Sequence, residues 1–364
     1  MRHRFHALCP YFAMFPETFA EYWLDKLTNR GNVVLDPFCG RGTLPFQALL
    51  MQRKTIGCDT NPVAYCVSRA KTNAPDLGRV LGRVDALEAA YRPHRVRAEA
   101  ATLPVFFRHA FHADTLNQIV YLRRELSFRR SDRDCMLTAV LLGALHGESN
   151  TSGRFLSNQM PHTISTKPDY SVKFWKEHGY KAPERDVFEH LREQLAYRYE
   201  TGKPEGRGII LNMDMRDLPR QAARLPRTIR CAVTSPPYFD VTNYAEDQWL
   251  RLWLLGESAQ PSRPGFSKDD RVGSVDRYWM LLTDMWRSFG MVLARNADIV
   301  IRVGATRLGP KQLVSGLEGV ARVTGRRVRL VSHTVSEIVK RQTESFRPGS
   351  TGCKVEVDCH FRMV

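Results

Sequence analysis

The sequence predicts an α/β fold with a mostly parallel sheet and a large, mainly helical insert. Short continuous apolar runs alternate along the 364 residues with segments in which apolar residues recur at helical spacing. This alternation is typical of strands buried on both faces between helices. The second and third predicted strands are separated by residues 75–205, far more chain than one crossover helix requires, so these residues are expected to form a subdomain.

Each predicted strand ends where polar residues or glycine begin. The runs are residues 33–35 before Asp36, 55–58 before Asp59, 209–211 ahead of Asp214, 229–233 before Ser235, and 298–303 before Gly304. Open α/β sheets bind ligands at the carboxyl ends of their strands. We therefore expect these residues to surround one site.

Two C-terminal runs, residues 328–331 and 355–361, bring the predicted strands to seven. Apolar and polar residues alternate in the last run, which predicts a half-exposed, antiparallel strand at an edge of the sheet. Within the insert, helices are expected at residues 114–126, 132–145 and 186–199, around an irregular polar middle from 147 to 181.

The charge of the chain points to an anionic partner. Lys and Arg number 54 against 38 Asp and Glu, giving a formal net charge of +16. Such a chain is attracted to nucleic acid through phosphate contacts and counterion release, although anionic membranes and acidic proteins remain alternatives. No run approaches the roughly 20 apolar residues of a membrane span, and the N-terminus lacks an apolar signal region, so we expect a soluble intracellular protein.

The eight cysteines do not predict a metal or disulfide framework. They include no C-x-x-C pair and no histidine partner at zinc-finger spacing. Cys58, Cys231 and Cys359 fall inside predicted strands, where they are expected to be small buried hydrophobic residues.

The first chemical motif is the strand-turn-helix segment Asp36–Thr43, whose turn contains Gly40 and Gly42. Glycines permit a tight turn and a close approach of a ligand to the backbone, and Asp59 ends the next strand, where it can accept hydrogen bonds from a ribose. The turn lacks both the full G-x-G-x-x-G pattern and the phosphate-gripping lysine of G-K-[ST]. A nucleoside without phosphates therefore fits it best.

The second motif, Ser235-Pro236-Pro237-Tyr238, directly follows a buried strand. Two prolines fix an extended path and remove two N–H donors, leaving carbonyls, a hydroxyl and an aromatic ring to face a ligand. The Ser235 hydroxyl and the Pro236 carbonyl can accept both protons of an exocyclic amine. Tyr238 can stack on an aromatic ring of a ligand.

Together, D-P-F-x-G-x-G-T and T-S-P-P-Y resemble the motifs of amino-methylating DNA methyltransferases. The resemblance implies a Rossmann-like methyltransferase sheet of seven strands with an antiparallel C-terminal strand, and S-adenosylmethionine as the cofactor. A serine at the head of the second motif is similar to the N4-cytosine group. The implied catalytic residues are Ser235, Pro236, Pro237 and Tyr238, and the implied cofactor-binding residues are Phe12, Phe15, Pro16, Asp36, Pro37, Phe38, Gly40, Gly42, Thr43, Asp59, Thr60, Asn61, Asp214, Met215 and Ser235.

Two of these interpretations have alternatives. Asp214 is implied to meet the adenine ring, but its place ahead of Leu218 equally predicts a helix N-cap. The insert is implied to be a target-recognition region, but its polar middle is equally typical of an ordinary surface loop, and it precedes the Asp214 segment instead of following it as in the relatives. The candidate DNA-binding residues are Arg154, Asn158, Gln159, Lys167, Asp240, Asn243 and Arg347.

The sequence therefore predicts a catalytic domain from residues 1–74 and 206–364, and a recognition subdomain from 75–205. The predicted partner is double-stranded DNA, with no metal and no membrane, in the cytoplasm or on a bacterial nucleoid, where a separate restriction endonuclease could accompany it. N6-adenine methylation, methylation of an RNA guanine amino group, and an inactive nucleic-acid binder remain alternatives. C5-cytosine methylation is set aside because none of the 20 prolines is followed by cysteine, the nucleophile that this reaction requires.

Overall fold

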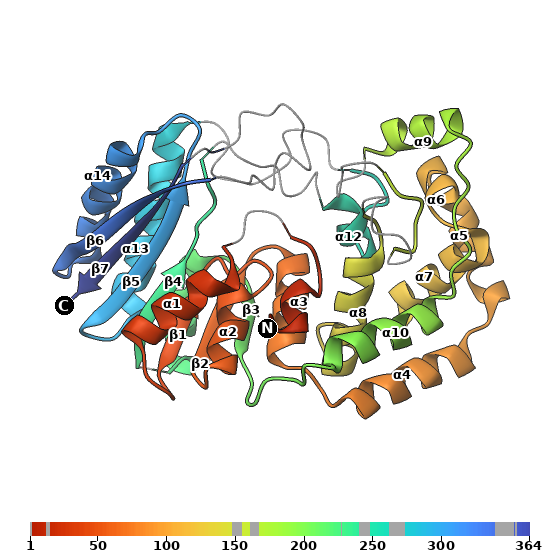
Figure 1. Cartoon of the computed structure of the whole chain (residues 1–364), viewed down its shortest axis with the longest axis horizontal. Helices are drawn as coiled ribbons and strands as arrows, with labels where there is room; N and C mark the ends of the chain where they lie inside the picture. Colours follow the sequence, from red (N-terminus) through yellow and green to blue (C-terminus); the bar gives the residue numbers. More distant parts are fainter. Residues whose placement is uncertain are drawn as a thin grey trace.

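The computed structural model describes residues 2–11, 15–147, 155–160, 167–226, 228–239, 248–261, 274–338, 353 and 355–364. A sheet lies on one side of the molecule and a group of helices on the other (Figure 1). No helix among these residues is long and apolar enough to cross a bilayer.

The described residues form one seven-stranded sheet in the order β3-β2-β1-β4-β5-β7-β6. Among these strands, β7 alone runs opposite to the direction of the other six. This order and the single reversed strand are those of the Rossmann-like methyltransferase fold, so the predicted fold class is confirmed. The strands are β1 (Val33–Asp36), β2 (Lys54–Asp59), β3 (Ile209–Asn212), β4 (Ile229–Thr234), β5 (Ala297–Gly304), β6 (Val328–Glu337) and β7 (Val355–Met363).

The edge position predicted for the last strand is wrong. β7 pairs with β5 on one side and β6 on the other, and β6 is the edge strand. The alternation of apolar and polar residues along β7 arises because its two faces differ in exposure to solvent. A strand inside a sheet can show the same difference. Its antiparallel direction is as predicted.

Alternate residues of the central strands pack on opposite layers of helices. Val34, Cys231 and Val300 pack with α1 (Glu17–Leu27) and α2 (Thr43–Leu50). Val33, Leu35 and Ile299 belong to the cluster that contains α13 (Val275–Val292) and α14 (Pro310–Ala321). Burial of both faces explains the apolar runs in the middle of these strands, such as Cys231–Val233 and Ile299–Ile301.

The residues between α3 (Pro62–Thr72) and β3 fold mainly as helices. Helices occur where the sequence predicts them, at α7 (Ala113–Glu125), α8 (Asp132–Ala144) and α10 (Val187–Tyr199). The expectation of an irregular middle is partly wrong, because α9 occupies part of it. The remaining helices are α4 (Leu77–Ala90), α5 (Arg97–Thr102), α6 (Val105–Ala110) and α9 (Pro168–Glu177).

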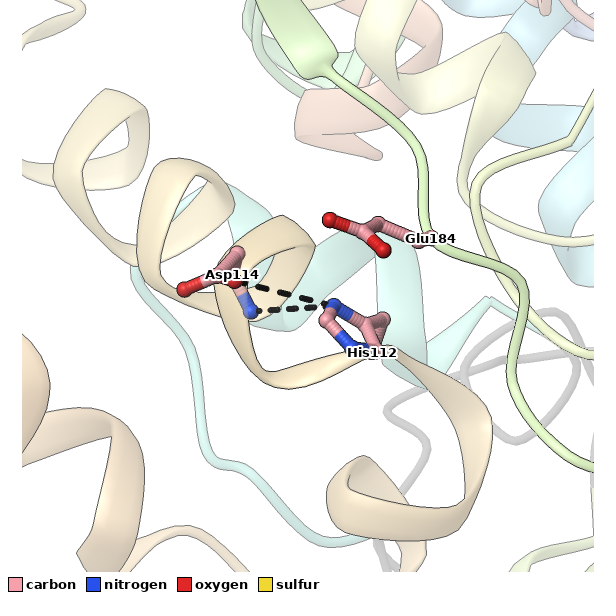
Figure 2. A group of neighbouring side chains, drawn as sticks. All are labelled: His112, Asp114 and Glu184. Atoms are coloured by element: carbon pink, nitrogen blue, oxygen red, sulfur yellow. Dashed lines mark hydrogen bonds and ion pairs between the residues drawn. The ribbon is translucent and has the colours of Figure 1, made fainter.

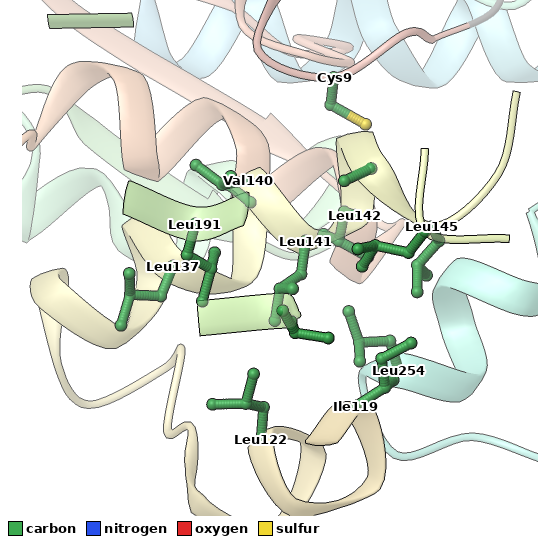
Figure 3. Close-up of a cluster of buried hydrophobic side chains, with 14 of the residues drawn as sticks. Cys9, Ile119, Leu122, Leu137, Val140, Leu141, Leu142, Leu145, Leu191 and Leu254 are labelled. Atoms are coloured by element: carbon green, nitrogen blue, oxygen red, sulfur yellow. The ribbon is translucent and has the colours of Figure 1, made fainter. Parts of the chain in front are cut away.

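One hydrophobic cluster joins this helical part to the start of the chain. It contains side chains of α3, α4, α7, α8 and α10, together with Cys9 and Phe5 of the N-terminal segment. Figure 3 shows Cys9 on the side of Leu142, toward the C-terminal end of α8, and Leu191 of α10 near Leu137 of α8. α12 (Trp249–Leu254) adds Trp249 and Trp253, which are buried in this cluster.

All eight cysteines are buried and free of disulfide bonds. Cys58, Cys231 and Cys359 are fully buried within their strands, which confirms their predicted packing role.

Candidate cofactor and catalytic site

The turn after β1 requires glycine at residue 42. Gly42 adopts a left-handed conformation (φ 72°, ψ 42°) at the N-cap of α2. A Cβ atom there would lie 2.6 Å from Ser68 Oγ and 2.9 Å from Ser68 Cα, both on α3. Backbone conformation and close helix packing therefore both exclude a side chain.

Gly40 fastens the turn to its neighbours. Its N–H donates to Asp59 Oδ2 at 2.9 Å, and its carbonyl accepts from Ser68 Oγ at 2.7 Å. The other Asp59 oxygen accepts from the N–H of Asn61 at 2.9 Å. The two predicted cofactor segments, at the ends of β1 and β2, are thus brought together directly.

The N-terminal segment covers this turn. The ring of Tyr11 lies 3.6 Å from where a Cβ of Gly40 would be, and the Asn61 side-chain amide donates to the Tyr11 hydroxyl at 3.1 Å. Asn61 also caps α3, since its side chain accepts from the N–H of Val63. Tyr11 is absent from the predicted site residues, although it directly precedes Phe12, the first of them.

The two motifs meet at a buried hydrogen bond. Thr234, the last residue of β4, donates its hydroxyl to Asp36 Oδ1 at 2.7 Å, and the same oxygen accepts from the N–H of Phe38 at 3.2 Å. Burial raises the pKa of Asp36 to about 7, and the nearby Asp59 adds to the rise. Ser235 follows Thr234 directly, so the loop of the second motif begins next to the first.

The Ser235–Tyr238 loop is held against the ends of β5 and β7. The Tyr238 hydroxyl donates to Glu356 Oε1 at 2.7 Å, and Phe239 forms a parallel bridge with Ala305. Burial raises the pKa of Tyr238 well above its usual value, the Glu356 carboxylate raises it further, and hydrogen bonding with Ser235 opposes the rise. Pro236 is buried, whereas Ser235 and Tyr238 are half-buried, so the loop is anchored yet still accessible.

The residues at this edge fit S-adenosylmethionine. The hydroxyl of Thr43 is buried and has no hydrogen-bond partner among the described residues, so it is available to a polar group of a ligand. Thr43 begins α2, Phe38 is half-buried in the turn, and Pro37 is buried beneath it. A left-handed glycine turn, an unused hydroxyl and the Asp59 carboxylate suit an uncharged ribose and an amino-acid end.

The remaining predicted cofactor residues are spread around this centre. Phe15 is buried against Phe19 of α1, Pro16 is exposed at the N-cap of α1, and Thr60 is exposed after β2. Phe12 lies outside the described residues.

Asp214 acts as a helix cap, which agrees with one of its two interpretations. It precedes the 3-10 helix Met215–Arg224, and its carboxylate accepts from the backbone N–H of Arg216 at 2.9 Å. The Arg216 guanidinium donates to both of its oxygens. Met215 is buried in the apolar layer that includes α13. The predicted contact of these two residues with adenine stays a prediction.

Three of the candidate DNA-binding residues, Asn158, Gln159 and Lys167, lie within the described part of the chain. Asn158 is buried, and its amide donates to the carbonyl of His109 at 2.9 Å, so it fastens the chain to α6 instead of facing outward. The Gln159 carbonyl accepts from Trp175 Nε1, and Lys167 is exposed at the N-cap of α9. Arg154, Asp240, Asn243 and Arg347 lie outside the described residues.

A separate cluster, His112, Asp114 and Glu184, lies in the helical part (Figure 2), and its donor atoms are within 4.8 Å of one another. His112 is the N-cap of α7, and its Nδ1 accepts from the N–H of Asp114 at 3.4 Å. Both acids are exposed. Capping of α7 therefore explains why His112 and Asp114 lie together.

Residues 3–68 match the model of a family described as DNA methylase. Over 75 residues the chain is 31% identical to the type II methyltransferase M.MjaII of Methanocaldococcus jannaschii. That stretch covers 21% of this chain and 14% of the relative, so the match spans a small part of that protein.

Several solved methyltransferase structures are distantly similar. TrmN from Thermus thermophilus is 10% identical with a TM-score of 0.39, covering 100% of this chain and 53% of that chain. The rRNA methyltransferase AviRa from Streptomyces viridochromogenes is 15% identical with a TM-score of 0.33, covering 97% and 87%. TYW2 from M. jannaschii, in complex with AdoMet, is 10% identical with a TM-score of 0.34, covering 97% and 80%.

Because these TM-scores are below 0.5, the fold assignment depends on the sheet order of the chain itself. The family match spans the segment that contains Tyr11, the Asp36–Thr43 turn and Asp59. Together, the match and the sheet order support an S-adenosylmethionine-dependent methyltransferase.

Proposed function

We propose that this chain is a DNA methyltransferase that moves the methyl group of S-adenosylmethionine to the exocyclic N4 of a cytosine flipped out of duplex DNA. The observation that carries the proposal is the hydrogen bond between Thr234 and Asp36. It fastens the Ser235–Tyr238 loop beside the glycine turn, so an acceptor loop for an amine adjoins a nucleoside-binding turn.

In this proposal, Gly40, Gly42 and Thr43 surround the amino-acid end of the cofactor, and Asp59 accepts from its ribose. The cofactor, when bound, supplies an electrophilic methyl group on a sulfonium. Ser235 Oγ and the Pro236 carbonyl accept the two amino protons of the target base, which directs the nitrogen lone pair toward the methyl carbon. Orientation of two bound reactants supplies much of the rate.

The +16 charge favours nucleic acid as the substrate. DNA is favoured over RNA by the family match over residues 3–68. The choice of cytosine N4 over adenine N6 depends on Ser235 at the head of the loop. We also propose residues 75–205 as the recognition subdomain and 1–74 with 206–364 as the catalytic domain.

The direct test is to incubate mixed-sequence duplex DNA with the protein and S-adenosylmethionine, digest the DNA to nucleosides, and weigh the products. N4-methylcytosine is expected. If N6-methyladenine is found instead, the target base is adenine and not cytosine. If methyl groups appear only in RNA in a parallel incubation, or in neither nucleic acid, the proposed substrate is wrong. Sequencing of methylated cytosines in DNA from expressing cells would then give the recognition sequence.

The assigned roles are tested by two variants. Ser235→Ala should lower the methyl-transfer rate by about 100-fold and leave S-adenosylmethionine affinity within about twofold, because it removes one acceptor of the amine. Asp59→Ala should chiefly weaken cofactor binding. Ser315→Ala, at an exposed position on α14, is the matched control and should behave as the parent. Equal loss of both functions in both folded variants would contradict the roles.

A further inference from the structure

An acid on the last strand of the sheet contacts the second motif. Glu356 is the second residue of β7 and pairs with Gly304 at the end of β5. Its Oε1 accepts the hydrogen bond of the Tyr238 hydroxyl at 2.7 Å. These two residues are 118 positions apart, so the contact depends entirely on the insertion of β7 between β5 and β6.

Glu356 is itself held in place. Arg302 Nη1 lies 3.3 Å from Glu356 Oε2. The Arg302 guanidinium also binds Asp358, with Nε 2.6 Å from Oδ1 and Nη2 2.8 Å from Oδ2. The guanidinium lies 3.9 Å from the ring centre of Phe19 on α1, and its side chain is only 12% exposed. A paired, stacked and largely buried arginine has little freedom, and it restricts Glu356 in turn.

The ring of Tyr238 is restricted on a second side. A Cβ atom on Gly304 would lie 2.9 Å from two carbons of that ring and 2.7 Å from Cys353 Sγ. The ring therefore packs directly on the backbone of β5. With the hydroxyl bound to Glu356 and the ring against Gly304, the side chain has one orientation.

We infer that Glu356 is a positioning residue for Tyr238, whose ring it orients toward the target base through the hydrogen bond to the hydroxyl. This inference depends on the proposed function, because it assigns the ring to the base that receives the methyl group. The bond requires a protonated phenol. The raised pKa of Tyr238 keeps the phenol protonated throughout the neutral range.

The test is a double-mutant cycle on methyl transfer to duplex DNA. Tyr238→Phe removes the donor and Glu356→Ala removes the acceptor, so each should lower kcat by about tenfold, with S-adenosylmethionine affinity unchanged. The double variant should also lose about tenfold. A loss of about a hundredfold in the double variant would mean that the residues act independently and would overturn the inference.

The conservative variant separates positioning from charge. Glu356→Gln keeps an oxygen that can accept the hydrogen bond from the Tyr238 hydroxyl, so its kcat should lie within about twofold of that of the parent. Glu337→Gln, at an exposed position on the neighbouring β6, is the matched control and should not change the rate. If Glu356→Gln is as impaired as Glu356→Ala, Glu356 does not act by accepting this hydrogen bond.

A second measurement does not need the reaction. The protein is labelled with ¹³C at the tyrosine Cζ, and the NMR signal that disappears in Tyr238→Phe is assigned to Tyr238. Glu356→Ala should shift this signal and lower the pKa of the Tyr238 phenol. Glu337→Gln should change neither the signal nor the pKa. An unmoved signal would overturn the inference even if the parent methylates DNA. If the parent methylates no DNA while the signal moves, the proposed function fails and the contact stands.

Discussion

The hydroxyl of Thr234 donates to the carboxylate of Asp36 across 2.7 Å, joining the ends of two adjacent parallel strands. Both bonds to Asp36, from Thr234 and from the N–H of Phe38, end on Oδ1. The other oxygen can therefore carry the proton that the raised pKa of about 7 predicts. The junction between the two motifs is consequently sensitive to pH.

Asp36→Asn should make the protein more stable than the parent at pH 8. The pKa of the folded carboxyl, about 7, lies above the unfolded value of 3.8, so the folded state holds a proton that the unfolded state has lost, and stability falls as pH rises between these values. Asparagine keeps the oxygen and avoids this cost. Urea unfolding should show a difference that grows from near zero at pH 4 to at most about 4 kcal/mol at pH 8. A stability difference between Asp36→Asn and the parent that does not change with pH would contradict the raised pKa of Asp36.

Binding of S-adenosylmethionine should tighten as pH rises through about 7. A positive sulfonium favours the ionised form of Asp36, whereas S-adenosylhomocysteine carries a neutral sulfur and should bind with little pH dependence. Calorimetric titrations of both ligands between pH 6 and 8.5 would measure this. In Asp36→Asn the two ligands should respond to pH alike, and a persistent difference would show that another group is responsible.

Gly42→Ala should destabilise the protein by more than Gly31→Ala. Both glycines have positive φ, 72° and 80°, but a Cβ on Gly31 meets nothing within 4 Å, whereas one on Gly42 overlaps Ser68. The Gly31 variant should lose about 1 kcal/mol from backbone strain alone. The Gly42 variant should lose about 3 kcal/mol or more and bind the cofactor poorly. Equal losses in chemical denaturation would exclude the overlap with α3.

Lys71→Met should stabilise the protein at neutral pH. Lys71 is fully buried on α3, and in the described part of the chain its amine donates to one group, the carbonyl of Arg41, at 2.6 Å. Burial, followed by repulsion from Arg41, lowers the pKa of Lys71. The unfolded lysine binds a proton that the folded one releases more easily, so stability rises with pH toward the ordinary lysine pKa. Removing the amine should add on the order of 1–3 kcal/mol at pH 7.

That gain should shrink as pH approaches about 10, which unfolding curves at several pH values would show. Lys311→Met, at an exposed position on α14, is the control and should change little. A loss of stability in Lys71→Met at neutral pH would show that the bond to Arg41 outweighs the cost of burying the amine.

The strands and the glycine turn could be predicted because their causes are local. Residues 33–35 and 231–233 are buried between the two helix layers and so are apolar without interruption. The carboxyl edge follows from the parallel direction of these strands, and it brought Asp36, Asp59 and Ser235 to one region as expected. The placement of β7 between β5 and β6 leaves no such local signal.

The contacts that complete the site are distant in the sequence. Ser68 supports Gly40 from α3, and Glu356 holds Tyr238 from β7. Neither residue type is unusual for its element, so neither stands out before the fold is known. Asn158 shows the opposite error, because a side chain able to read a base edge serves instead to hold α6. α9 was missed because its segment is rich in polar residues.

The hydrophobic cluster that α3 shares with the helical part limits how the protein can be re-engineered. Val63, Cys66 and Val67 of α3 pack against that part and not against the sheet alone. A truncated protein without residues 75–205 would expose this apolar face to water and would be prone to aggregate. Replacing residues 75–205 with the corresponding part of another protein would require matching side chains along α3 and in residues 5–11. The helical part and the rest of the chain therefore have to be redesigned together.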